Sequence, residues 1–425
     1  MSTALRTVIA DPSNLPPLIA ALAEVLEGSQ SYLPLPPAST PAATVANEDL
    51  ASLMRAGTEI MPGTLIACTS GSTGTPKGAL LTASNLRSSG EATAAYLQET
   101  FGSKPGAWLL TLPPHHIAGL QVILRSISAG CTPLVASHLV DSAPFTVESF
   151  IADTERLQQA YPDRDLYTSL VPTQLERLAA NPGTPQRTAA LEALASYSAI
   201  LVGGAASRTE LIDSLRAQGI HLTLTYGSSE TAGGMVYDGH PLPGASVTIE
   251  DPDDTGRGRV ILSGPMVARG YRNAPGSPAF PLAGTFVTSD LGTMTDAALS
   301  ILGRADGAIN SAGYKVLPED VERAVHATLP EVTLADGSTV PTQTLCATGI
   351  EDPQFGQAIA LAIEGGVEEK DGHHKPTDIT TQVRDALRGR VTKHLIPQRA
   401  VLVSQLPTSG PGKINRKEVA KIFQQ

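Results

Sequence analysis

The stretch Thr69–Gly78 reads TSGSTGTPKG and follows directly on an apolar run of strand length, TLIACT, at 64–69. Glycines let the backbone approach an anion closely, while hydroxyl groups and Lys77 supply donors and a positive charge. The pattern differs from the P-loop consensus GxxxxGK[ST], because the fifth residue after Gly71, where that consensus has its second glycine, is Pro76. We predict a polyphosphate-binding loop with contacts from Lys77 and from Thr69, Ser70, Gly71, Ser72, Thr73 and Gly74.

Short apolar runs alternate with helical patterns on both sides of this loop. Strands are predicted at 107–112, 132–135, 167–171, 199–202 and 222–225, and helices at 18–26, 83–96, 117–129, 173–180 and 209–218, whereas 33–45, rich in Pro, Ala and Ser, is predicted as a loop. Such alternation is typical of α/β layers around a mainly parallel sheet.

The pattern changes after residue 246. Short strands at 247–250, 259–263, 285–289 and 299–302 predict a small antiparallel sheet or barrel. Beyond 303, helices at 318–329 and 379–394 and strands at 344–350 and 358–363 predict a small α+β domain. The expected organisation is a large α/β N-terminal domain (1–303), with layered sheets flanked by helices plus the small β-barrel, a hinge (304–307) and a small C-terminal domain (308–425).

Composition excludes several classes of function. The 425 residues carry a formal charge of −11, so a surface that binds nucleic acid nonspecifically is not expected. The sequence contains no run of 18 apolar residues, so a transmembrane helix is not expected. The N-terminus also lacks the pattern of a secretory signal. Three widely spaced cysteines fit neither a disulfide framework nor a zinc site. We expect a cytoplasmic protein, with homo-oligomers possible since they are common.

The loop and the motifs that follow it resemble the adenylate-forming superfamily of acyl- and aryl-CoA ligases, adenylation domains and luciferases. Its phosphate loop, [ST]-S-G-[ST]-T-G-x-P-K-G, is matched throughout by Thr69–Gly78, and the resemblance covers roughly residues 64–420. The YGSSET run at 226–231 resembles Y-G-x-[ST]-E of the family. The resemblance implies that Tyr226 and Gly227 lie against adenine, that Ser229 contacts a phosphate and that Glu230 holds Mg²⁺.

Later motifs imply the remaining parts of such a site. Asp290 resembles the aspartate that holds the ribose hydroxyls, Arg304 adds ribose or phosphate contacts, and Asp306 is the pivot of the hinge. The resemblance places Gly313, Tyr314 and Lys315 along the tunnel for the CoA thiol. It also makes Lys413, in the Gly/Pro-rich run 407–414, the catalytic lysine that bridges the carboxylate and the α-phosphate.

The chemistry implied is a two-step ligation that uses ATP, Mg²⁺ and CoA as co-substrate. A carboxylate attacks the α-phosphate of ATP and expels pyrophosphate, and the CoA thiol then attacks the acyl carbon and releases AMP. No side-chain nucleophile is required, which agrees with the lack of a Ser-His-Asp or Cys-His signature.

Three segments (112–121, 169–178 and 201–207) resemble the branch of the superfamily that activates o-succinylbenzoate, an aromatic dicarboxylate of menaquinone synthesis. The resemblance implies acid-binding roles for His116, Thr173, Gly203, Gly204 and Ser207, with His116 also a catalytic candidate. His115 is interpreted as a packing residue. Arg125 and Arg177 are interpreted as surface salt-bridge partners, with carboxylate binding as the alternative.

Other activities stay open. Another aryl- or acyl-CoA ligase, a stand-alone adenylation protein that loads a carrier-protein thiol, and a catalytically dead nucleotide-binding protein would all share this core. The presence of Glu230, Asp290 and Lys413 argues against the last of these.

Overall fold

The computed structural model describes residues 2–69, 75–311, 314–334, 337–353, 356–365, 376–409 and 413–424. The chain divides into two units. The large unit holds residues up to Thr248 together with Ile261–Thr288 and Thr295–Leu299, and the small unit holds Ile249–Val260, Ser289–Met294 and Ser300–Gln425. The division therefore passes through the segment predicted to be a sheet or barrel.

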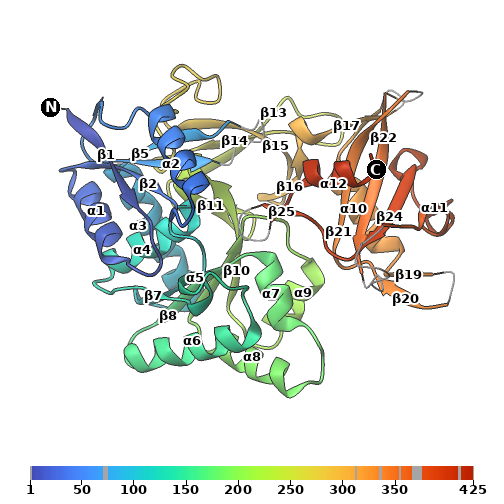
Figure 1. Ribbon diagram of the computed structural model, residues 1–425, viewed down its shortest axis with the longest axis horizontal. Helices are drawn as coiled ribbons and strands as arrows, with labels where there is room; N and C mark the ends of the chain where they lie inside the picture. Colours follow the sequence, from blue (N-terminus) through green and yellow to red (C-terminus); the bar gives the residue numbers. More distant parts are fainter. Residues whose placement is uncertain are drawn as a thin grey trace. The chain divides into compact units, whose positions relative to one another are not determined.

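The large unit begins with a five-stranded sheet whose strand order is β3-β1-β2-β4-β5. Its strands are β1 (Thr3–Ile9), β2 (Ser31–Leu35), β3 (Glu59–Ile60), β4 (Thr64–Thr69) and β5 (Lys77–Thr82). Helices α1 (Pro16–Glu27) and α2 (Pro41–Leu53) belong to the same part of the chain (Figure 1). The loop predicted at 33–45 is confirmed only for residues 36–40, because β2 extends to Leu35 and α2 begins at Pro41. Thr40 caps α2, its hydroxyl accepting from the amide of Ala43 at 3.2 Å.

A seven-stranded sheet, with the order β12-β11-β10-β9-β8-β6-β7, forms the centre of the large unit. Strands β6 (Ala107–Leu110), β7 (Leu134–Val135), β8 (Leu166–Leu170), β9 (Ala199–Gly203) and β10 (Leu222–Ser228) are parallel. Strand β11 (Gly233–Tyr237) pairs antiparallel with β10, and β12 (His240–Pro241) pairs antiparallel with β11. The predicted parallel α/β layer is thus confirmed.

Helices connect these strands and cover the sheet. They are α3 (Ala83–Phe101), α4 (Ile117–Ser128), α5 (Ser137–Val140), α6 (Val147–Ala160), α7 (Pro172–Ala179), α8 (Pro185–Ala195) and α9 (Thr209–Arg216). Figure 1 shows α6 and α8 side by side, and their apolar faces join the core that contains Phe150, Leu157 and Leu194. The burial of these side chains, roughly 1.5–3 kcal/mol for each large one, is what holds the layer together.

The four strands that follow form a sheet with the order β13-β14-β15-β16. They are β13 (Ser246–Glu250), β14 (Gly258–Ser263), β15 (Thr285–Thr295) and β16 (Ala298–Arg304), which places a sheet at the four segments predicted to be strands.

The small unit has a six-stranded sheet with its own apolar core. Its strands are β17 (Ile309–Ser311), β18 (Tyr314–Val316), β21 (Leu345–Asp352), β22 (Gly356–Glu364), β23 (Thr377–Asp378) and β24 (Arg399–Val403); β19 (Glu331–Thr333) pairs with β20 (Thr339–Pro341), and β25 (Thr408–Ser409) with β26 (Lys413–Ile414). Its helices are α10 (Pro318–Thr328), α11 (Thr380–Leu387) and α12 (Arg416–Ile422).

The helix predicted at 379–394 is too long. Helix α11 ends at Leu387, and Gly389 takes a left-handed conformation with φ of 74°. The backbone already leaves the helix at Arg388 (φ −62°, ψ 125°), and the Arg390 amide then donates to the Leu387 carbonyl at 3.1 Å. Glycine adopts the left-handed conformation that this turn needs without steric cost.

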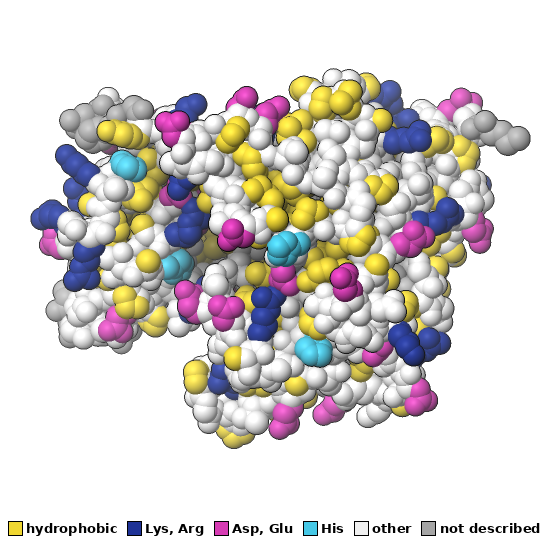
Figure 2. Space-filling view, turned by 180° about the vertical axis from the view of Figure 1, so that it is seen from behind, with side chains coloured by type: hydrophobic (Ala, Val, Ile, Leu, Met, Phe, Trp, Pro, Cys, Tyr) yellow, Lys and Arg dark blue, Asp and Glu magenta, His cyan; other side chains and the backbone are white. Residues whose placement is uncertain are grey.

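Among the helices of the described residues, none is both long and apolar enough to cross a membrane. On the face shown in Figure 2, acidic and basic side chains are interspersed.

Candidate active site

The predicted site residues of the large unit gather at one edge of the seven-stranded sheet. His116 follows β6, Thr173 follows β8, Gly204 and Ser207 follow β9, and Ser229 and Glu230 follow β10. These four strands are parallel, so their carboxyl ends meet at the same edge. In open α/β sheets ligands bind outside this edge. The topology thus brings the predicted acid-binding residues and the YGSSET motif into one region.

Glu230 is held by a tyrosine that the sequence did not single out. Its side chain is only 7% exposed, and the Tyr271 hydroxyl donates to Oε1 at 2.7 Å. The Lys77 ammonium lies 5.1 Å from the centre of the Tyr271 ring. Lys77 opens β5, where it pairs with Thr69 at the end of β4. A carboxylate and an ammonium from distant parts of the sequence therefore meet around one aromatic ring.

The segment 268–273 places Tyr271 by running beside β5. Tyr271 forms a bridge with Ala79, and the amide of Arg272 donates to the Gly78 carbonyl at 2.7 Å. Asn273 Oδ1 accepts from the Gly78 amide at 3.1 Å. Strand β5, which follows the predicted phosphate loop, is thus fixed by a segment almost two hundred residues further along the chain. Residues 70–74, which include the predicted contacts Ser70, Gly71, Ser72, Thr73 and Gly74, lie outside the described residues.

A short 3-10 helix, η1 (Ser229–Thr231), presents Glu230 and ends in a left-handed residue, Ala232, with φ of 53°. The Ala232 carbonyl accepts two hydrogen bonds, from Ser89 Oγ at 3.1 Å and Gln121 Nε2 at 2.6 Å. Ser89 lies on α3 and Gln121 on α4. A non-glycine residue in this conformation costs roughly 1–2 kcal/mol, which these two bonds help to offset.

Two glycines of this edge stand where no side chain fits. A Cβ at Gly227 would lie 2.0 Å from the Gly233 carbonyl oxygen, and one at Gly203 would lie 2.3 Å from Thr225 Oγ1. Gly227 follows Tyr226 at a register shift between β10 and β11. Both positions require glycine because neighbouring strands pack closely there, so this requirement does not indicate a ligand.

His115 and His116 stand together at the start of α4, with ring centres 4.2 Å apart. Burial, together with the neighbouring His116 ring, lowers the pKa of His115 to about 3, and burial lowers the pKa of His116 as well. Both rings are therefore neutral at pH 7, and His116 offers an acid a hydrogen bond rather than a positive charge. Thr173, in the first turn of α7, and Ser207 are half-buried.

Three predicted residues of the small unit form one ion-pair cluster. The Arg304 guanidinium binds Asp306 through Nε at 2.9 Å and Nη2 at 2.7 Å, and its Nη1 lies 3.6 Å from Asp290 Oδ1. The side chains of Arg304 and Asp306 are 41% and 39% exposed. Arg304 thus links Asp290, the predicted partner of the ribose hydroxyls, to Asp306, the predicted pivot.

Three further predicted residues, Tyr314, Lys315 and Lys413, lie in paired strands of the small unit. Tyr314 and Lys315 are exposed in β18, and the Tyr314 ring stacks on His394 with centres 5.2 Å apart. Lys413 pairs with Ser409 in the β25–β26 hairpin. Gly313 and the side chain of Lys413 lie outside the described residues.

Neither Arg125 nor Arg177 forms an ion pair within the described part of the chain, so the predicted surface salt bridges are wrong for both. Arg125 lies over the Trp108 ring, 5.3 Å from its centre. Arg177 donates to the Phe145 carbonyl instead. The Arg125 guanidinium also donates to the hydroxyls of Thr93 and Tyr237, at 3.3 and 3.4 Å.

A magnesium ion suits the carboxylate of Glu230. Tyr271 occupies only one lone pair of Oε1, and the hydroxyl holds the carboxylate in place. Mg²⁺ is commonly bound by one or two protein carboxylates together with substrate phosphates. Glu230 would hold the ion, which when bound would neutralise charge on the phosphate oxygens.

The AMP-binding enzyme family matches residues 59–272, about half of the chain. The chain belongs to the family of AMP-binding enzymes. The resemblance to adenylate-forming enzymes is thereby confirmed, and the matched range contains Lys77, Glu230 and Tyr271. The chain is also similar to a probable 2-succinylbenzoate–CoA ligase of Mycobacterium tuberculosis, with 37% identity over 96% of this chain and 95% of the relative.

Two solved structures of o-succinylbenzoate CoA synthetase from Bacillus subtilis share the fold of this AMP-binding enzyme. The complex with the acyl-adenylate intermediate has a TM-score of 0.66 at 22% identity and covers 98% of this chain and 82% of that one. The complex with ATP and magnesium has a TM-score of 0.65 at 22% identity and covers 97% and 83%. The predicted fold class, a large α/β part and a small α+β part, is confirmed by this likeness.

Proposed function

We propose that this AMP-binding enzyme ligates 2-succinylbenzoate to CoA at the expense of ATP, by way of an acyl-adenylate. The observation that carries the proposal is the similarity to the M. tuberculosis ligase along almost the whole length of both chains. The geometry agrees with it, because Lys77, Tyr271 and Glu230 form a charged, hydrogen-bonded group next to the carboxyl edge of the sheet.

In the first step the acid carboxylate attacks the α-phosphate of ATP. An acyl–phosphate bond forms, and the bond to the pyrophosphate leaving group breaks. Lys77 and the phosphate loop are proposed to hold the phosphates, Glu230 to hold Mg²⁺, Tyr226 and Gly227 to lie against adenine, and Asp290 and Arg304 to bind the ribose. Lys413 is proposed to stabilise the charge that grows during attack.

In the second step the CoA thiol attacks the acyl carbon, a thioester forms, and AMP leaves with the bonding electron pair. Tyr314, Lys315 and Gly313 are proposed to line the path of the thiol, and Asp306 to be the pivot that lets residues 308–425 serve both steps. The reaction is proposed to take place in the cytoplasm, and free cysteines are typical of that compartment.

The acid pocket is proposed to select an aromatic dicarboxylate. Gly204, where a Cβ would meet only Val171 at 3.8 Å, is proposed to leave room for a flat ring against the backbone, and the hydroxyls of Thr173 and Ser207 and a neutral His116 are proposed donors for its two carboxylates. His116→Ala should mainly raise KM for the acid, because it removes an interaction made in the ground state.

A panel of acids tests the assignment. The enzyme is supplied with ATP, Mg²⁺ and CoA and with 2-succinylbenzoate, benzoate, malonate or octanoate in turn, and AMP and acyl-CoA are measured. We expect 2-succinylbenzoate to be turned over with the highest kcat/KM. Efficient turnover of another acid, with none of 2-succinylbenzoate, would leave the ligase chemistry standing and overturn the substrate. Transfer to a carrier protein but not to CoA would favour the carrier-loading alternative.

A further inference from the structure

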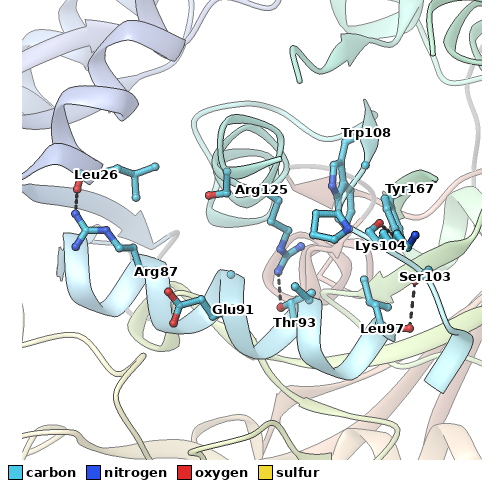
Figure 3. A pocket seen from close by; sticks show the side chains of 15 residues that line it. Leu26, Arg87, Glu91, Thr93, Leu97, Ser103, Lys104, Trp108, Arg125 and Tyr167 are labelled. Carbon is cyan, nitrogen blue, oxygen red and sulfur yellow. Dashed lines mark hydrogen bonds between the residues drawn. The ribbon is translucent and has the colours of Figure 1, made fainter. Parts of the chain in front are cut away.

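A cavity of about 330 Å³ lies in the large unit, between α3, α4 and the segment that leads into β6. We refer to it as the amino-edge cavity; its wall includes Leu26, Thr93, Leu97, Pro105, Trp108 and Arg125 (Figure 3). Ligand pockets typically begin at about 300 Å³, so a medium-sized molecule fits. Most of the wall is apolar, with Trp108 stacked on Tyr167 at 4.9 Å between ring centres.

One guanidinium stands in this apolar wall. Arg125 reaches from α4 toward α3, where Nη2 donates to Thr93 Oγ1 at 3.3 Å, and it lies over Trp108 (Figure 3). Its Nε is buried and has no hydrogen-bond acceptor among the described residues. A buried donor without an acceptor typically costs about 1–3 kcal/mol. The residue itself is part of the cavity lining, so a carboxylate in the cavity would lie beside this guanidinium.

The charges around the cavity favour an anion. Its lining holds three basic residues, Arg87, Lys104 and Arg125, and one acidic residue, Glu91. This local excess of positive charge stands out in a chain whose net charge is −11. A carboxylate matches the planar, forked guanidinium well and forms strong charge-assisted hydrogen bonds with it.

The cavity is separate from the candidate active site. Trp108 and Tyr167 lie at the amino ends of β6 and β8, the edge of the sheet opposite to the one that carries His116 and Thr173. Arg125 and His116 are nine residues apart on α4, which corresponds to about 13 Å along a helix. A molecule in the cavity therefore does not occupy the place of the acid substrate.

We propose that the amino-edge cavity is a second binding site, for a monocarboxylate with a medium-sized apolar body. The apolar part fills the space between Leu26, Leu97 and Trp108, and the carboxylate pairs with Arg125. Arg87 and Lys104 add attraction at the lining. The same two helices hold the Ala232 carbonyl through Ser89 and Gln121, so the ligand contacts the elements that position η1.

Trp108 provides a direct readout, because it is the only tryptophan of the chain. The full-length protein is titrated with octanoate while the tryptophan emission is recorded, and 1-octanol serves as the uncharged control. We expect a saturable change in emission with octanoate and at least tenfold weaker binding of octanol.

Three variants locate the binding. Gly90 lines the cavity on α3, and a Cβ placed there meets no atom within 4 Å, so a side chain at this position can start into the cavity, and Gly90→Leu is designed to occupy it. Gly90→Leu should abolish the octanoate response, and Arg125→Gln should weaken it at least tenfold. Arg177→Gln, an arginine of α7 outside the cavity, is the matched control and should bind octanoate like the parent.

Circular dichroism of each variant confirms that the fold is kept, and calorimetry repeats the titration without relying on tryptophan. An emission change that persists in both Gly90→Leu and Arg125→Gln would overturn the proposal, as would the absence of saturable binding to the parent protein. A response lost in His116→Ala but kept in Gly90→Leu would place the octanoate in the acid pocket and likewise overturn it. None of these outcomes depends on which acid the enzyme activates.

Discussion

The large and the small unit hold their charged site residues in contrasting ways. In the large unit Glu230 is buried, and its carboxylate accepts from one tyrosine whose own position is fixed by backbone bonds to β5. In the small unit Arg304 and Asp306 are more than a third exposed and are held by each other. A buried hydrogen bond is costly to break, whereas an exposed ion pair contributes roughly 0–1 kcal/mol.

The contrast suits different tasks. A carboxylate proposed to hold Mg²⁺ needs one fixed position, and the buried bond from Tyr271 supplies it. Asp306, proposed to be the pivot between the two steps, and Arg304 beside it need interactions that break at little cost. Arg304 and Asp306 meet that requirement because water replaces each lost contact.

The largest effect is expected for Lys413→Ala. Removal of one preorganised donor to a developing charge typically costs on the order of 100- to 1000-fold in kcat. Adenylation should slow by that factor, while ATP affinity and thioester formation from pre-made acyl-adenylate stay nearly unchanged. Single-turnover kinetics of the two steps provide the measurement, with Lys421→Ala on α12 as control. Equal slowing of both steps would contradict the role assigned to Lys413.

Tyr271→Phe tests the buried half of the comparison. The substitution leaves the ring under Lys77 and removes the donor to Glu230. We expect kcat/KM for ATP to fall about tenfold, which corresponds to about 1.4 kcal/mol for one hydrogen bond. Tyr96→Phe removes a similar hydrogen bond to Asp238 and should leave kcat/KM unchanged. Equal losses in the two variants would mean that Tyr271 acts on stability alone.

The burial of His115 and His116 predicts that the folded protein loses stability in acid. Their pKa values are lowered in the folded protein, to about 3 for His115, whereas an unfolded histidine titrates near 6.5. Below about pH 6.5 the unfolded chain binds protons that the folded chain does not, so the free energy of unfolding falls, by at most about 1.4 kcal/mol per pH unit and histidine. Above that pH the contribution is fully present.

Urea unfolding between pH 7.5 and pH 5 measures this slope. His115→Asn should reduce it, whereas His240→Asn, at an exposed position, should keep it. A parent and a His115→Asn variant with identical slopes would show that burial does not hold His115 neutral.

The smallest effect is expected for Asp306→Asn, the exposed half of the comparison. Loss of the pair with Arg304 should change the free energy of unfolding by less than about 1 kcal/mol. Asp306→Pro, which restricts the backbone at the same place, should instead impair adenylation and thioester formation unequally. If proline slows both steps equally in a folded protein, the pivot lies elsewhere.

The sequence predicted the parallel layer because its strands are continuous apolar runs, which buried parallel strands require. It predicted the carboxyl-edge residues through their motifs. It did not predict α2, although Thr40 and Pro41 are typical of a helix start, because the surrounding Pro, Ala and Ser suggested a loop. Helices α6 and α8 were also missed.

Tyr271 was missed for a different reason. Nothing in the spacing between residues 79, 230 and 271 indicates that they meet, since the contact arises from a bridge between segments far apart in the chain. In the small unit, Arg304 and Asp306 are only two residues apart in the sequence. Their ion pair was nevertheless not predicted, because the two residues had been assigned separate roles. Local patterns specify elements, whereas contacts between distant elements depend on the assembled fold.

The bonds that fix the phosphate-loop strand and η1 also determine when the site forms during synthesis. Gln121 and Ser89 bind Ala232 over separations of 111 and 143 residues, and Gly78 binds Asn273 over 195. Contacts between residues this far apart form late, since the intervening chain has to be ordered first. A nascent chain that has not yet reached residue 273 therefore holds the phosphate-loop sequence but not the lock that fixes its strand. The candidate site is therefore fully assembled only after well over half of the chain has been synthesised.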